Sequence, residues 1–201
     1  ERSQGKYLFF LDSDDFIANF ALESLYEECI DWKMPDVLLS EGEFLYSEDG
    51  ITKRRNFNCK EYKGISGRDA ILKTMHIAPN WGVFGKCYRL DYWRKHGFWF
   101  SKGKLGEDLE MVDRVVLEAE TISMVPTFYY YRLSRGGSLT TEVNKKQKFD
   151  DLLALISWEK YFEEKHIDEE VRTAFRSMTV RMYCYEILGS VYLFKGDEKK
   201  E

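Results

Sequence analysis

The sequence predicts an α/β domain followed by an α-helical extension. Apolar runs of strand length alternate with amphipathic segments of helical period up to about residue 140. From Asn144 onward the pattern changes to two long helices. Alternating strands and helices are typical of a sheet covered by helices. We therefore expect the catalytic-type α/β part over residues 1–140 and the helical extension over residues 141–201.

The apolar run Tyr7–Leu11 predicts the first strand. Because both faces of this strand are apolar, we expect it to lie inside a sheet, with earlier strands supplied from outside this chain. Asn19 is then expected to cap a helix that runs to about Lys33, with one apolar face made of Leu22, Leu25, Tyr26, Cys29 and Ile30.

Two strands and a short helix follow. Val37–Tyr46 and Ile51–Arg55 have strand character and are joined by the turn Glu48-Asp49-Gly50. A short helix is expected over Gly67–Met75, and mixed strand and turn over Trp81–Tyr88.

The remaining elements complete the predicted order. Asp91–His96 reads as one or two helical turns, and the loop Ser101–Gly106 precedes a helix that opens with Glu107-Asp108. The apolar face of that helix consists of Leu109, Val112, Val115, Val116 and Ala119. A strand over Thr121–Arg132 follows, and Asp168 is expected to cap the second C-terminal helix.

Composition restricts the class of function. The formal charge of −5 argues against general nucleic-acid binding. The four cysteines form no C-x-x-C pair, and with only three histidines they do not resemble a zinc site. No apolar run approaches the ~18 residues that a membrane span needs, and no secretory signal is present. We expect free thiols and a cytoplasmic location.

The acidic cluster Asp12-Ser13-Asp14-Asp15 is the first candidate site. Asp12 and Asp14 are two residues apart and share a face in an extended segment, at the strand end where α/β sheets bind ligands. Crowded carboxylates repel one another, and a divalent metal with oxygen ligands would offset this repulsion. The alternative is an ordinary strand-to-helix turn with capping aspartates.

Three further features are candidates. Glu107-Asp108 follows a loop whose glycines suit a closing lid, although acids at a helix start are also favoured by the helix dipole alone. Arg132 and Arg135 could bind phosphate oxygens, or could be ordinary surface arginines at a strand end. Trp81 could stack on a sugar, or could belong to the core.

The order of these motifs resembles family 2 glycosyltransferases with the GT-A fold. Gly5–Asp15 resembles their D-x-D strand, Trp81–Arg89 looks like their acceptor-side segment, and Gly106-Glu107-Asp108 matches their E-D motif. Tyr129–Arg132, continuing to Thr140, matches the end of their catalytic domain. The helical extension resembles those of bacterial members that build surface polysaccharides. The resemblance implies a partial, Rossmann-like GT-A sheet with flanking helices.

The resemblance also implies roles for the motif residues. Asp12 would contact the nucleotide ribose of the donor and, with Asp14, a Mn²⁺ or Mg²⁺ ion that bridges its diphosphate, while Asp15 would support that site. Asp108 would be the general base toward the acceptor hydroxyl, with Glu107 beside it. Trp81 would lie on the acceptor side. Arg132 would bind the departing diphosphate. The expected reaction inverts the sugar carbon, with a nucleotide sugar as donor and a saccharide or lipid-linked acceptor.

Two departures from the family pattern qualify these roles. Some relatives place a metal-binding histidine near the position of Arg132, so the third protein ligand is open. The family's N-terminal half, which holds the nucleotide base, is absent before Glu1. The chain also has neither the Q-x-x-R-W motif nor the membrane spans of processive synthases, which favours addition of one sugar at a time.

Two other classes are open. A haloacid dehalogenase-type phosphotransferase also uses D-x-D, but Phe16 stands where that class has Thr or Val, and Glu107-Asp108 would be unexplained. A catalytically inert, truncated binding module is the other. The C-terminal helices could dock on a membrane surface or on a second copy, although packing on their own domain is favoured.

Overall fold

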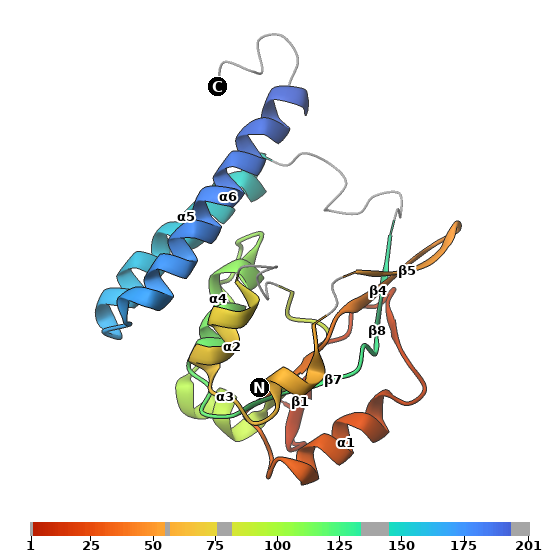
Figure 1. Cartoon of the computed structure of the whole chain (residues 1–201). Coiled ribbons are helices and arrows are strands. Elements are labelled where there is room, and N and C mark those ends of the chain that lie inside the picture. The colour runs from red at the N-terminus through yellow and green to blue at the C-terminus, as the bar shows by residue number, and fades with distance from the viewer. Residues whose placement is uncertain (1, 55–56, 76–81, 134–144, 194–201) are drawn as a thin grey trace.

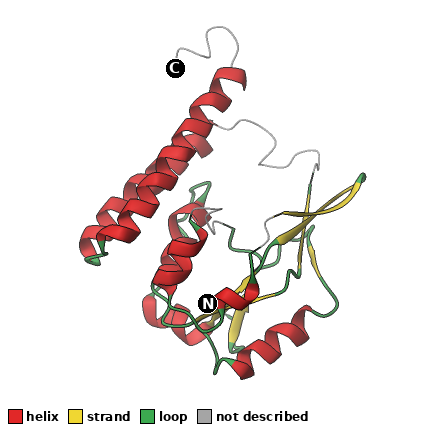
Figure 2. Cartoon of the chain, in the orientation of Figure 1, coloured by secondary structure: helices red, strands yellow, loops and turns green. Residues whose placement is uncertain are grey.

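The computed structural model describes residues 2–54, 57–75, 82–133 and 145–193, and within them the strands form two four-stranded sheets. The first sheet has the order β1 (Tyr7–Phe9), β6 (Lys86–Arg89), β3 (Val37–Ser40) and β7 (Ile122–Val125). The second has the order β2 (Phe16–Ile17), β8 (Tyr129–Arg132), β4 (Glu43–Ser47) and β5 (Gly50–Arg54). Figure 2 shows these strands on one side of the helices α2 and α4. The α/β class predicted from the sequence is confirmed.

Two segments that the sequence predicts as single strands are each divided between the sheets. Residues 37–46 form β3 and then β4, and residues 121–132 form β7 and then β8. The partners stay together across the break, because β3 pairs with β7 in parallel and β4 pairs with β8 in parallel. Pro126 lies in the second break, where its missing N–H ends the ladder. The acidic cluster also connects the two sheets, from β1 in the first to β2 in the second.

The first strand was predicted to lie inside a sheet whose earlier strands are missing or supplied elsewhere, and in the described part of this chain it has one open edge, so the prediction stays untested. Among the described residues β1 pairs only with β6, in antiparallel register, and lies at the edge of its sheet. Its side chains are half-buried, and Leu11 just beyond it is 48% exposed. The apolar residues on both faces of β1 made the sequence pattern resemble that of an interior strand, although one edge of the strand is open.

The helix α1 (Ala21–Asp31) begins one residue later than a cap at Asn19 would require. The capping position is Phe20, with no hydrogen bond from its side chain, so the predicted Asn19 cap is wrong. The predicted apolar face is also divided. Leu25 and Cys29 are buried, whereas Leu22, Tyr26 and Ile30 are 71%, 67% and 59% exposed.

The remaining helices of the α/β part match their predictions closely. A 3₁₀ turn (Cys59–Tyr62) precedes α2 (Gly67–Thr74), and α3 (Leu90–His96) follows β6 directly. The helix α4 (Glu107–Leu117) packs between α2 and the C-terminal hairpin. Its predicted apolar face is confirmed, since Leu109, Val112, Val115, Val116 and Ala119 are all buried.

The C-terminal helices α5 (Lys145–Glu164) and α6 (Glu169–Leu193) run side by side as a hairpin in Figure 1. The Asp168 carboxylate accepts the N–H groups of Glu170 and Val171 at 3.1 and 3.2 Å, which confirms the predicted cap. Trp158, Phe162 and Phe175 join the same buried cluster as Val115 and Met124. The hairpin therefore packs on its own domain.

The outer face of this hairpin carries exposed apolar side chains, including Phe149, Ile156 and Val180. Docking of the hairpin on a membrane surface or on a second copy stays a prediction. In the described part of the chain, no helix is both long and apolar enough to cross a membrane.

Candidate active site

The acidic cluster forms a tight turn that is fixed by the second sheet. The Asp15 N–H donates to the Asp12 carbonyl oxygen at 3.1 Å, which closes the turn. The Asp12 N–H contacts the Tyr129 hydroxyl oxygen at 3.3 Å, and the Tyr46 hydroxyl donates to the Asp14 carbonyl oxygen. Strands β8 and β4 thus hold the backbone of the turn.

Asp15 uses both carboxylate oxygens to bind β8. One accepts the Tyr129 hydroxyl at 2.7 Å and the other accepts the Arg132 N–H at 2.8 Å. These bonds join the turn to the strand that ends at Arg132. Asp15 therefore orients the turn, in line with the supporting role expected for it.

We expect Tyr129→Phe to lower the free energy of unfolding by about 1.5–3 kcal/mol, because it removes a hydrogen bond to a carboxylate beside a buried ring. Tyr130→Phe is the matched control: the Tyr130 ring stacks on Phe16 and Phe44, and in the described part of the chain its hydroxyl makes no hydrogen bond that stabilises the turn. Urea unfolding of both variants measures the difference. Equal losses in the two variants would contradict the role given to Asp15.

Asp12 is exposed and Asp14 is half-buried in the turn. Burial, followed by the charges of Asp15 and Asp14, raises the pKa of Asp12 above its usual value. A divalent cation bound by one or two carboxylates takes its other oxygens from water and from substrate phosphates. The turn fits a cation in that manner. Among the described residues, no group of three His, Cys, Asp or Glu side chains forms a complete protein-only metal site.

Asp108 lies in the first turn of α4, where its carboxylate contacts a neighbouring segment. Its Oδ2 atom accepts the Val83 N–H at 2.9 Å, so the carboxylate is bound to a different segment and not to its own helix end. Burial, helped by the charges of Glu107 and Asp12 and opposed by the Val83 N–H and Lys86, raises the pKa of Asp108 to about 6. Asp12 is the last of these influences, and it puts Asp108 within electrostatic range of the acidic turn.

The structure gives less information on the other predicted site residues. Glu107 is half-buried next to Asp108, and Arg132 is exposed at the end of β8. Trp81 and Arg135 lie outside the described residues. The roles of the two acidic motifs stay predictions.

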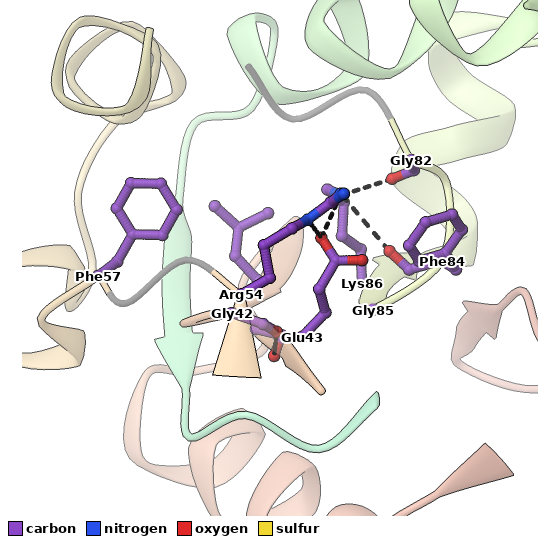
Figure 3. Close-up of a pocket in the computed structure, with 10 residues that line it drawn as sticks. Gly42, Glu43, Arg54, Phe57, Gly82, Phe84, Gly85 and Lys86 are labelled. Carbon is purple, nitrogen blue, oxygen red and sulfur yellow. Dashed lines mark hydrogen bonds and ion pairs between the residues drawn. The ribbon is translucent and has the colours of Figure 1, made fainter. Parts of the chain in front are cut away.

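Lys86 and Val83 are site residues that the sequence reasoning missed. Lys86 is 7% exposed at the start of β6 and lines a pocket together with Glu43, Arg54, Phe57, Gly82 and Phe84 (Figure 3). A lysine placed directly before the apolar pair Cys87-Tyr88 in a buried strand was the available signal, because lysine is rarely buried without a partner.

Comparison with known proteins gives a consistent class. No family model matches the sequence. The chain is 27% identical to glycosyltransferase GlyA of Streptococcus pneumoniae serotype 4 over 146 residues, which cover 66% of this chain and 20% of that protein. It is 19% identical to cholesterol galactosyltransferase of Borreliella burgdorferi over 202 aligned positions, which cover 95% of this chain and 54% of that protein.

A solved structure shows the same fold. The TarS 1-349 structure from S. aureus, in complex with UDP-GlcNAc, matches with a TM-score of 0.55 at 19% identity, over 77% of this chain and 43% of that one. The chain therefore has a glycosyltransferase-like fold and glycosyltransferase homologues. It spans about half the length of the cholesterol galactosyltransferase and a fifth of GlyA.

Proposed function

We propose that this chain is the donor-metal and acceptor part of an inverting, family 2 glycosyltransferase with the GT-A fold. It transfers a sugar from a nucleotide-sugar donor to a hydroxyl of a saccharide or lipid-linked acceptor. The observation that carries the proposal is the Asp108 carboxylate, which has a pKa of about 6, is fixed by the Val83 N–H and lies near the Asp12 turn. A base with a pKa near the working pH is what general base catalysis requires.

The chemistry follows from these positions. Asp108 accepts the proton of the acceptor hydroxyl as its oxygen forms a bond to the anomeric carbon. The bond from that carbon to the diphosphate oxygen breaks, and the nucleoside diphosphate leaves with the electron pair. Attack opposite the leaving group inverts the carbon. Bound Mn²⁺ or Mg²⁺, held by Asp14 and Asp12, would neutralise the diphosphate, and Arg132 offers a second cation at the end of β8.

We place this reaction in the cytoplasm, at the inner face of a membrane if the acceptor is lipid-linked. The four cysteines are free thiols, which is typical of a reducing compartment. Surface-polysaccharide synthesis is the proposed setting.

Calorimetric titration of the full-length protein with UDP, with and without Mn²⁺, tests the donor half of the proposal. UDP is the first nucleotide to test because TarS was solved with UDP-GlcNAc. We expect Mn²⁺-dependent binding in the micromolar range. No binding of UDP or of another nucleoside diphosphate would favour the inert module instead.

A further inference from the structure

The turn Gly82–Gly85 supplies the N–H that fixes Asp108, so the stability of this turn controls the position of the carboxylate. The Val83 N–H meets Asp108 Oδ2 at 2.9 Å. Gly85 ends the turn with a φ of 63°, a left-handed conformation that favours glycine. The turn has no helix or strand of its own, and contacts with neighbouring elements hold it; one is the Ser40 N–H of β3, which donates to the Gly85 carbonyl oxygen at 3.1 Å.

Two side chains of β6 fold back and bind three successive carbonyl groups of this turn. The Lys86 ammonium donates to the Gly82 oxygen and to the Phe84 oxygen, the latter at 3.4 Å. The Tyr88 hydroxyl donates to the Val83 oxygen between them at 3.2 Å. Figure 3 shows Lys86 directed at the carbonyls of Gly82 and Phe84. The carbonyl groups of Gly82, Val83 and Phe84 are thus all bound by side chains of β6.

The surroundings keep Lys86 in this place. Its side chain is buried at the wall of the pocket that Glu43 of β4 and Arg54 of β5 also line. Arg54 pairs with Glu43 at 3.0 Å. A buried ammonium needs acceptors, and two of those available to Lys86 are the carbonyls of the turn.

We infer that Lys86 is a positioning residue of the proposed transfer site: it locks the Gly82–Gly85 turn so that the Val83 N–H orients the Asp108 carboxylate. This inference rests on the proposed function for its catalytic consequence, but the positioning itself does not. The charged or titratable groups around Asp108 are Glu107 of α4, Lys86 and Tyr88 of β6, and Asp12 of the acidic turn. Lys86 is the cation in this set.

Amide hydrogen exchange at Val83 tests the positioning without any ligand. In Lys86→Met, which keeps the apolar stem and removes the ammonium, we expect exchange at Val83 to accelerate about tenfold or more. Lys53→Met is the matched control, because Lys53 on β5 pairs with Glu41 and, in the described part of the chain, makes no hydrogen bond to the turn, so Val83 should be unchanged. Unchanged exchange in a folded Lys86→Met variant overturns the inference, whether or not the protein transfers sugar.

Tyr88→Phe keeps the test decisive if Lys86→Met does not fold. It removes only the hydroxyl on the Val83 oxygen, and we expect about threefold faster exchange at Val83. No change in that variant overturns the claim that β6 holds the turn.

The catalytic consequence has a separate readout. Lys86→Met should lower kcat and move the acidic limb of the pH profile upward, with the donor KM unchanged, because the ammonium opposes protonation of Asp108. Faster exchange together with an unchanged kcat and pH profile would reject the link to catalysis. Absence of transfer in the unmodified protein would instead reject the proposed function and leave the exchange result standing.

Discussion

Asp108→Asn is expected to lower kcat for sugar transfer by about 10²–10⁴-fold, the range that a general base contributes. The asparagine oxygen can still accept the Val83 N–H, so the turn and the helix start are kept while the proton acceptor is lost. The affinity for the nucleotide sugar should stay within about threefold, because Asp108 acts on the acceptor. Steady-state transfer and calorimetric donor binding measure the two quantities.

The matched control for this variant is Glu110→Gln. Glu110 lies in the same first turn of α4, but its carboxylate is bound by Lys104 and Ser101, both at distances below 3 Å. Its kcat should be nearly unchanged. Equal loss in both variants, or transfer that survives in Asp108→Asn, would show that Asp108 is not the base.

The pH dependence of the unmodified protein follows from the same carboxyl. The base must be deprotonated, so kcat should fall about tenfold per unit below pH 6 and level off above it. The raised pKa also has a cost in stability: the half-buried Asp108 favours its protonated form, so stability is lost as the pH rises from the usual carboxyl pKa of 3.8 to about 6 and stays low above that. Asp108→Asn should therefore raise Tm most at pH 8, less at pH 5, and not at pH 3.

Asp14→Ala is expected to abolish the Mn²⁺-dependent part of nucleoside diphosphate binding, a loss of more than about 100-fold in affinity. The carbonyl of residue 14 still accepts the Tyr46 hydroxyl in the variant, so the turn is kept. Ser13→Ala, one residue away in the same exposed turn, is the control and should bind normally. Titration of each variant with UDP, with and without Mn²⁺, provides the measurement. Unchanged metal-dependent binding in Asp14→Ala would contradict the metal assignment.

Local periodicity predicted the helices well. The apolar face of α4 and the Asp168 cap come from spacing within a single segment, and both were found. The capping residue and outer face of α1 were wrong, because Leu22, Tyr26 and Ile30 follow helical spacing yet lie on the side away from the core. Spacing alone does not say which side a neighbouring element covers.

The sheet was harder to predict than the helices. Residues 37–46 and 121–132 have continuous strand character, and the passage from one sheet to the other at Pro126 depends on long-range pairing. In the proposed site, Asp12 and Asp108 were predicted from motifs, whereas Lys86 was not. Its partners are carbonyl groups of a turn, and backbone acceptors leave no mark in the sequence.

The most direct test is release of nucleoside diphosphate from UDP-GlcNAc and other nucleotide sugars by the full-length protein, with candidate acceptors, compared with Asp108→Asn across pH 5–8. We expect Mn²⁺-dependent release that rises through about pH 6 in the unmodified protein. The variant should bind the donor without releasing product. Equal release by both proteins, or donor binding with no acceptor-dependent release at any pH, would contradict a sugar-transfer site built on Asp108.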